Sequence, residues 1–267
     1  MTVAVGSKCY SLGAPPCKGE GRTWTDDELD EAIDGKIAAL VFDEQGKADI
    51  EELLSSVAET EFEQEQLAEA LADADADDIE DWRVGEAIAE AYLTEHRDCL
   101  FPWPDGRDER KSGSSLPGAD LVGIQHDTKG DRFAFGEVKT SGEAKHPPGA
   151  VYGRTGLKQQ LEDLRDKASI RNDLFEYLAH RAKNSSWLDR FKAATKRYLA
   201  NTSDVQLFGV LVRDVDPHKD DVRVRVEKLG NNCPTGTEIE LLALYLPAGA
   251  ISDLASKALA TRPGGSA

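Results

Sequence analysis

Two short stretches decide how this chain folds: Gly118–Ile124, with the sequence GADLVGI, and Phe133–Ser141, with the sequence FAFGEVKTS. Each stretch has the length and apolar content of a β-strand, and the HDTKGD segment between them is typical of a turn. The sequence therefore predicts a β-hairpin. If the turn is centred on Thr128 and Lys129, Asp120 lies directly opposite Glu137.

The second strand carries an abrupt change from apolar to charged residues. Alternate strand residues share a face, so Phe133, Phe135, Glu137 and Lys139 lie together. Residues directly opposed across two strands have Cβ atoms about 4.5–5.5 Å apart. Two carboxylates about 4 Å apart repel by roughly 4 kcal/mol at an effective dielectric constant of 20. A divalent cation between Asp120 and Glu137 turns this repulsion into coordination.

These residue types predict metal-dependent hydrolysis of a phosphodiester. Mg²⁺ (or Mn²⁺) prefers hard oxygen ligands and usually takes one or two carboxylates. We expect Asp120 and Glu137 to be ligands, with the backbone carbonyl of Val138 as a further one. Lys139 is expected to orient or deprotonate a water and to offset charge on the phosphate. The alternative interpretation is an exposed cross-strand cluster of ion pairs.

GADLVGI followed by FAFGEVKTSGE resembles the PD-(D/E)xK nuclease superfamily. Its pattern is an Asp at the start of one strand and Glu-x-Lys on the next, and Asp120, Glu137 and Lys139 match it. Ala119 stands where the superfamily usually has Pro. The resemblance implies an α/β (α+β) restriction-endonuclease-like core with a mixed sheet flanked by helices. It also implies cleavage of DNA.

More narrowly, the chain resembles the nuclease subunit of Hachiman-type antiphage defence, the HamA family. The resemblance extends from WRVGEAIAEAYL through FPWPDGRDERKSGSSLPGAD to FGEVKTS. It implies a helicase partner of the HamB type and degradation of DNA by the complex.

The resemblance also points to supporting residues. Some superfamily members use a Glu on the helix before the hairpin as a metal ligand, and Glu86 is the candidate here. RecB-like members carry a Gln on the helix after the Glu-x-Lys strand, which is Gln159 or Gln160.

Three basic residues flank the hairpin on its C-terminal side and could hold phosphates: Lys145, Arg154 and Lys158. Ordinary solvated surface side chains are the alternative interpretation for these three, and for Glu86 and the glutamines as well.

The net charge of −18 by itself argues against a nucleic-acid ligand, because DNA is a polyanion. The charge is unevenly distributed, however. Residues 1–100 carry 27 acidic and 7 basic side chains, whereas residues 101–267 carry 23 and 25. Residues 151–200 have a local charge of +5. Such polarity is consistent with one face for nucleic acid and another for a protein partner.

The remaining pattern predicts an acidic, mostly helical region over residues 1–80 and a nuclease-like domain over residues 81–267. Residues 1–22 are expected to be irregular. Thr25 with Glu28 forms a capping box at a helix start, and residues 82–96 form an amphipathic helix. Helices are expected at 156–168, 171–183, 186–200 and 251–260. Strands are expected at 205–212, 222–228 and 238–246.

The sequence has no apolar run that could span a membrane and no secretory signal, and its four cysteines are scattered. We therefore expect a cytoplasmic protein with reduced thiols.

The leading hypothesis is a Mg²⁺-dependent deoxyribonuclease within a defence complex. A sequence-specific restriction-type endonuclease and a non-catalytic nucleic-acid-sensing scaffold remain open.

Overall fold

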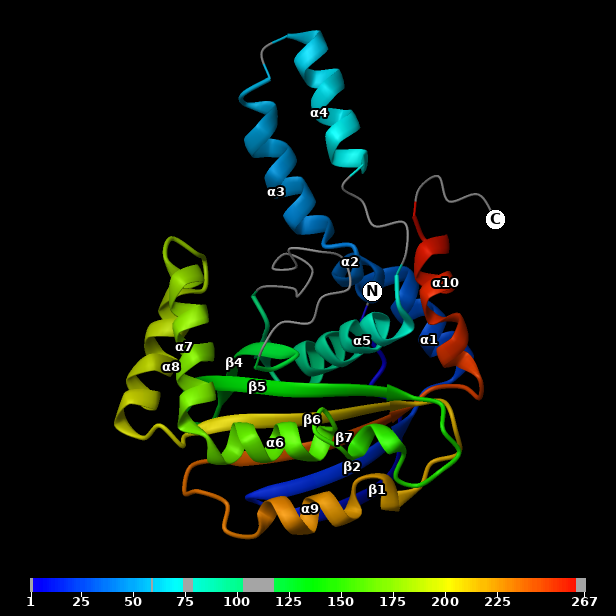
Figure 1. Ribbon diagram of the computed structural model, residues 1–267, viewed down its shortest axis with the longest axis vertical. Coiled ribbons are helices and arrows are strands. Elements are labelled where there is room, and N and C mark those ends of the chain that lie inside the picture. Colours follow the sequence, from blue (N-terminus) through cyan, green and yellow to red (C-terminus); the bar gives the residue numbers. More distant parts are fainter. Residues whose placement is uncertain (1, 59, 74–78, 103–117, 263–267) are drawn as a thin grey trace.

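The computed structural model describes residues 2–58, 60–73, 79–102 and 118–262. Its centre is a seven-stranded mixed sheet in the order β1-β2-β7-β6-β5-β4-β3 (Figure 1). The pairs β2–β7, β7–β6 and β6–β5 are parallel, and the three outer pairs are antiparallel. The strands are β1 (Ser7–Ala14), β2 (Cys17–Thr23), β3 (Cys99–Leu100), β4 (Leu121–Asp127), β5 (Gly130–Ser141), β6 (Val205–Arg213) and β7 (Glu238–Tyr245).

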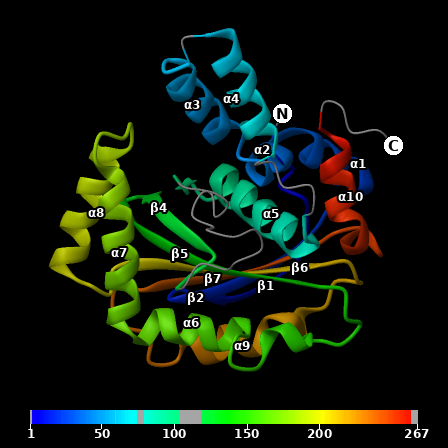
Figure 2. The ribbon, with the colours of Figure 1, turned by 45° about the horizontal axis from the view of Figure 1, so that its top comes forward.

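Helices cover both faces of the sheet, so the predicted α/β class with a mixed sheet flanked by helices is confirmed (Figures 1 and 2). The α-helices are α1 (Asp26–Ala32), α2 (Ala38–Val41), α3 (Glu44–Ser55), α4 (Glu61–Asp73), α5 (Asp81–His96), α6 (Leu157–Asp166), α7 (Ala168–Ala182), α8 (Leu188–Ala200), α9 (Arg223–Gly230) and α10 (Leu254–Ala260). The shorter helical turns are η1 (Ile33–Ile37), η3 (Gly149–Val151), η4 (Lys219–Asp221) and η5 (Ala250–Asp253).

Each face of the sheet has its own apolar core, because alternate strand residues point to opposite faces. Ala134 and Val138 of β5 pack with α5 on one face. Phe133 and Phe135 pack with helices α6 to α9 on the other. Glu137 and Lys139 have the same parity as the two phenylalanines, so they belong to the face that α6 and α9 cover.

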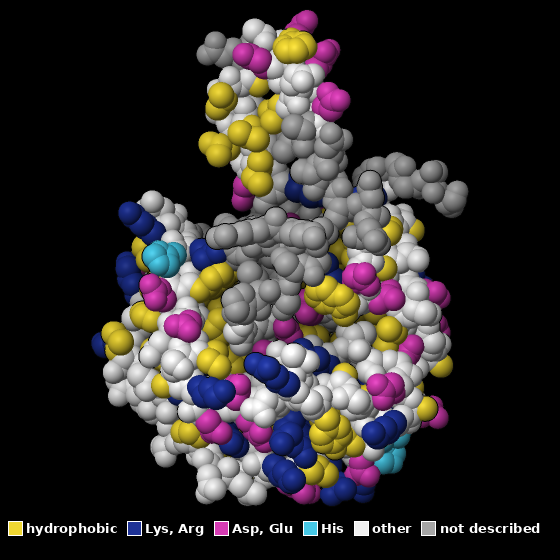
Figure 3. Space-filling model, in the orientation of Figure 1, with side chains coloured by type: hydrophobic (Ala, Val, Ile, Leu, Met, Phe, Trp, Pro, Cys, Tyr) yellow, Lys and Arg dark blue, Asp and Glu magenta, His cyan; other side chains and the backbone are white. Residues whose placement is uncertain are grey.

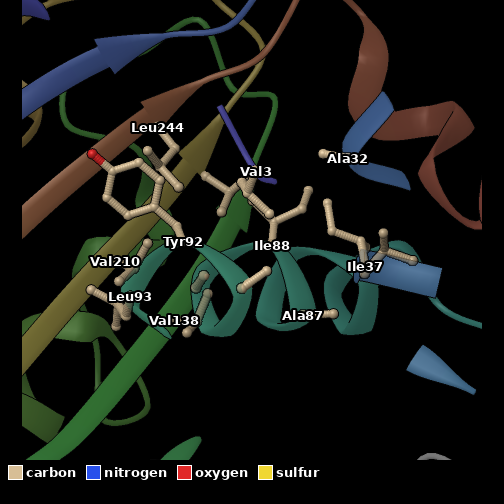
Figure 4. Close-up of a cluster of buried hydrophobic side chains, with 14 of the residues drawn as sticks. Val3, Ala32, Ile37, Ala87, Ile88, Tyr92, Leu93, Val138, Val210 and Leu244 are labelled. Carbon is tan, nitrogen blue, oxygen red and sulfur yellow. The ribbon is translucent and has the colours of Figure 1, made fainter. Parts of the chain in front are cut away.

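The predicted amphipathic stripe of residues 82–96 is confirmed in α5. Its residues Ile88, Tyr92 and Leu93 are fully buried: Tyr92 and Leu93 lie beside the sheet residues Leu244 and Val210, and Ile88 lies beside Val3 (Figure 4). The helix approaches β5 closely at Gly85, where a Cβ atom would overlap the hydroxyl of Thr140. Glycine in mid-helix lowers helix propensity, and here it permits this contact.

Most of the other predicted elements are confirmed. Residues 157–166, 168–182 and 188–200 are helical, and residues 205–213 and 238–245 are strands. The capping box is present: Thr25 N–H donates to Glu28 Oε2 at 2.8 Å, and Glu28 N–H donates to Thr25 Oγ1 at 3.3 Å. The stretch FPWPDGRDERKSGSSLPG is rich in Pro, Gly and Ser and predicts a loop, and its residues 103–117 lie outside the described residues.

The strand predicted at residues 222–228 is wrong, because this segment forms α9. Val222, Val226 and Leu229 also have helical spacing, and all three are buried. Val226 fits against β1 and β2, where glycines leave room: a Cβ at Gly13 or Gly19 would be 2.6 or 2.7 Å from its methyl groups. The helix therefore buries its valines against a surface that the strand pattern did not reveal.

The irregular N-terminus is also corrected. Residues 7–23 form the β1–β2 hairpin, and β2 runs parallel to β7 from the pair Cys17–Ile239 to the pair Thr23–Tyr245. Residues on both sides of the predicted boundary at residue 80 therefore contribute strands to one sheet. The hairpin of α3 and α4 projects from the body (Figures 1 and 2). Within the described ranges, no helix is long and apolar enough to cross a membrane.

Candidate functional site

The β4–β5 hairpin has the predicted register. Leu121 pairs with Gly136, and the ladder continues to the pair Asp127–Gly130 beside the turn. Asp120 precedes the first pair by one residue and so lies opposite Glu137. Its carboxylate accepts a hydrogen bond from the Val138 N–H at 2.7 Å, which fixes it against the neighbouring strand.

The three predicted catalytic residues come together. The ammonium group of Lys139 is 3.3 Å from Asp120 Oδ2 and 3.4 Å from Glu137 Oε2, so it bridges the two carboxylates. The Glu137 residue is 0% exposed, while the side chains of Asp120 and Lys139 retain 10% and 20%. The site is thus closed at Glu137 and open to solvent at Lys139.

Burial and charge shift the protonation of this cluster. Burial raises the pKa of Glu137 well above its ordinary value, and the nearby Asp120 charge raises it further against the opposing effect of Lys139. Burial lowers the pKa of Lys139, but the charges of Asp120 and Glu137 outweigh burial and raise it. Lys139 is therefore a cation at neutral pH.

Glu137 has an unmet requirement for a partner. Its Oε1 is buried and accepts no hydrogen bond from any described residue. Buried polar atoms are nearly always satisfied, so such an oxygen calls for an explanation. A hard divalent cation supplies the missing partner and favours carboxylate oxygens, so the residues fit Mg²⁺ or Mn²⁺.

The Val138 carbonyl has the direction that its predicted ligand role needs. A strand residue directs its N–H and C=O to the same side, and the N–H of Val138 points to Asp120. The β4 ladder ends at Leu121–Gly136, so β4 does not extend to Val138. The carbonyl thus faces the same edge as the Asp120 carboxylate.

The predicted role of Glu86 receives no support from the geometry. Among the described residues, no group of three or more His, Cys, Asp or Glu side chains is placed to hold a metal ion. Glu86 is half-buried on α5, which covers the face of the sheet opposite to Glu137. The possible ligand set is therefore two carboxylates and one backbone carbonyl, which leaves further positions for water and phosphate.

The predicted phosphate contacts lie on the segment after β5. Lys145 and Arg154 are exposed, and Lys158 is within 3.7 Å of Glu162 one helical turn on. Gln159 donates to Asp163 at 2.8 Å, so its amide is engaged along α6. The neighbouring Gln160 has a buried Oε1 that no described residue contacts by a hydrogen bond. Between the two glutamines, the structure favours Gln160 as the one directed inward.

Sequence reasoning missed the residues that hold the loop after β5. The buried Arg213 donates to the carbonyls of Ser141, Glu143 and Lys145 at 2.7–3.0 Å. His146 Nδ1 lies 2.9 Å from the buried Asp221 carboxylate. The available signal was the charged pair Arg213–Asp214 at the end of a continuous apolar strand.

The chain matches no protein-family model, and no curated protein sequence is significantly similar to it.

Proposed function

We propose that the chain is a metal-dependent nuclease with a PD-(D/E)xK-type site that hydrolyses DNA phosphodiester bonds. The observation that carries the proposal is the convergence of Asp120, Glu137 and Lys139, in which a buried carboxylate oxygen of Glu137 has no hydrogen-bond partner among the described residues. Without a cation this arrangement costs folding free energy, because a buried carboxylate oxygen with no hydrogen-bond donor is unfavourable. A bound cation removes that cost.

Each residue has a distinct role in this proposal. Mg²⁺ or Mn²⁺ polarises the scissile phosphate and lowers the pKa of a bound water when it is present. Asp120 is oriented for coordination by the Val138 N–H, and Glu137 offers its unpartnered oxygen. Lys139 remains protonated, because the neighbouring carboxylates raise its pKa. It therefore offsets negative charge on the phosphate and orients the water.

The test is cleavage of plasmid and single-stranded DNA with Mg²⁺ or Mn²⁺ by the wild type and by Lys139→Ala. Lys129→Ala is a matched control, because Lys129 is an exposed lysine in the turn at the other end of the same hairpin. We expect the wild type and the control to cut and Lys139→Ala to lose at least 100-fold in rate, the scale of one electrostatic contact to a transition state. Equal cleavage by all three proteins would overturn the assignment.

We further propose that a basic partner protein, the helicase that the HamA resemblance implies, docks on the α3–α4 hairpin. Leu53, Val57 and Phe62 are each 66–70% exposed on this acidic hairpin. Ile50, Leu53 and Val57 follow one another at helical spacing, so they share a stripe. Figure 3 shows apolar side chains gathered on one side of the projecting hairpin. Exposed apolar patches of this kind mark interaction sites, and acidic surroundings favour a basic partner.

This second proposal has its own test. The tagged chain and a variant with Leu53, Val57 and Phe62 replaced by serine are purified from the native cells. A helicase that accompanies the wild type and is lost from the variant supports the docking surface. A helicase recovered with both proteins, or with neither, would contradict it and leave the nuclease proposal standing.

A further inference from the structure

Arg225 is a buried arginine without the partners that buried arginines need. It is 4% exposed, and its Nε and Nη1 atoms are inaccessible and donate to no described residue. The other three buried arginines of the described chain have more acceptors: Arg132 donates to Gln125, Gln206 and Glu238, and Arg171 and Arg213 each donate to three carbonyls, although the Nε of Arg213 has no acceptor. An uncompensated buried guanidinium is unfavourable, so this position calls for an anion.

The surroundings of Arg225 connect three elements. Arg225 lies in the first turn of α9, and its Cζ atom is 5.7 Å from the centre of the Tyr152 ring. The backbone of Tyr152 lies against Gly156, where a Cβ atom would overlap its carbonyl. Gly156 is the N-cap residue of α6. Tyr152 therefore connects the two features: its ring lies beside the Arg225 guanidinium, and its backbone lies beside the start of α6.

The start of α6 favours an anion as well. No side chain caps it, and its first turn contains no acidic residue. The unpaired N–H groups and the helix dipole at such an end attract negative charge. Lys158 lies in this turn and Arg154 just before it. The buried guanidinium of Arg225 is a second, independent feature of this region that calls for an anion.

The region around Tyr152 lies on the face of the sheet that carries Glu137, because α6 and α9 both cover that face. Tyr152 is 44% exposed, so a ligand can approach this region from solvent beside the tyrosine ring. Helices α6 and α9 are neighbours, since Arg165 Nη1 on α6 donates to the Leu229 carbonyl on α9 at 3.1 Å (Figure 2). Leu157 and Leu161 of α6 lie over Gly209, whose partner on β5 is Glu137.

We infer that Arg225, Tyr152 and the first turn of α6 form a binding site for a phosphate group. A guanidinium is a strong donor to phosphate oxygens, and the Nε and Nη1 atoms of Arg225 each lack an acceptor among the described residues. The exposed tyrosine ring offers a surface on which a base can stack. Assignment of the phosphate to a DNA strand that leads to Glu137 rests on the proposed nuclease function. The phosphate site itself does not, and inorganic phosphate or a mononucleotide has the same chemistry.

The first experiment measures Tm against inorganic phosphate, with NaCl of equal ionic strength as reference. It compares the wild type with Arg225→Met and with the control Arg223→Met, an exposed arginine in the same helix turn that pairs with Asp220. We expect phosphate well above its Kd to raise the Tm of the wild type and of the control by several degrees. We expect no phosphate-dependent rise for Arg225→Met. Equal shifts in all three proteins, an adventitious ion only, or no shift in any would overturn the inference.

The second experiment identifies the source of the phosphate. Binding of a labelled single-stranded DNA is measured in EDTA, which prevents metal-dependent cleavage. If the phosphate belongs to a strand, Arg225→Met weakens binding about tenfold and reduces the salt slope by about one. Unchanged DNA binding together with a lost phosphate shift assigns the site to a free phosphate or nucleotide. If Arg225→Met does not fold, Tyr152→Ala and Arg225→Lys decide by the same two readouts, since a weaker phosphate shift is expected in both and an unaltered one refutes the site.

A phosphate shift in a chain that cuts no DNA would retain this site and discard the proposed nuclease. Cleavage without any phosphate shift would do the opposite.

Discussion

Replacement of Glu137 by Gln should stabilise the metal-free protein and abolish its response to metal. Glu137 is fully buried, one of its oxygens has no partner among the described residues, and Asp120 repels its charged form. Removal of an unsatisfied buried charge relieves about 1–3 kcal/mol. At about 2 kcal/mol, and about 2–4 °C for each kcal/mol in a domain of this size, Tm rises by about 4–8 °C.

The effect should depend on pH in a defined direction. The folded-state pKa of Glu137 is raised, so the folded protein holds this proton more tightly than the unfolded chain. The associated stability is fully present below the unfolded pKa of about 4.3 and is lost as pH rises through the folded pKa. The advantage of Glu137→Gln over the wild type should therefore be absent at pH 4 and grow toward pH 8.

The assay is urea unfolding at pH 4–8.5, in EDTA and in Mg²⁺, with Glu31→Gln on exposed α1 as the control. In EDTA at pH 8, Glu137→Gln should have the highest free energy of unfolding. Mg²⁺ at about 100 times its Kd should add about 2.7 kcal/mol to the wild type and the control but little to the variant. A variant that is less stable than the wild type in EDTA at pH 8 would show that Glu137 acts as a stabilising ion-pair partner, and the reasoning would fail.

Three further outcomes are expected, two from the packing of the core and one from a surface charge. Gly85→Ala should lower the free energy of unfolding by about 1–3 kcal/mol, since the added methyl group overlaps the Thr140 hydroxyl. Thermal or urea unfolding measures this loss, and an unchanged Tm would refute the close approach of α5 to β5. Arg213→Met should destabilise by about 3–5 kcal/mol, because it removes the cation paired with the buried Asp221 and leaves three loop carbonyls without their donor. Unfolding that matches the wild type would count against this anchor. Arg154→Ala should weaken DNA binding to all sequences alike and reduce the salt slope by about one, as titrations at several salt concentrations would reveal; a sequence-dependent loss would instead indicate base contacts.

The candidate site was largely readable from local sequence. The two-residue period of a strand and a short turn are enough to specify the register of a hairpin. Asp120, Glu137 and Lys139 all lie within one such hairpin, so no distant contact was needed to bring them together. The helices of residues 82–96 and 157–200 were likewise evident, because their apolar residues recur at helical spacing.

The contribution of distant segments was not readable in this way. The strand β2 exists because its backbone pairs with β7, more than 200 residues later, and its glycines carry no pattern of their own. The segment 222–228 alternates like a strand, yet its valines fit a helix that covers β1 and β2. Arg213 and Arg225 both lie in apolar surroundings, but only the fold distinguishes the arginine that anchors a loop from the one left without an acceptor.

The sequence by itself determined the hairpin, its register, the three charged residues that meet across it and most of the helices. These depend on residues close together in the chain, where side-chain period and turn chemistry act directly. The tertiary structure alone decided that the N-terminus completes the sheet, that Glu86 lies on the helix that covers the opposite face, and that one oxygen of Glu137 and two nitrogens of Arg225 are buried with no hydrogen-bond partner among the described residues. Burial and satisfaction of polar groups are properties of the whole packed molecule, since they depend on what every other segment brings to the same place.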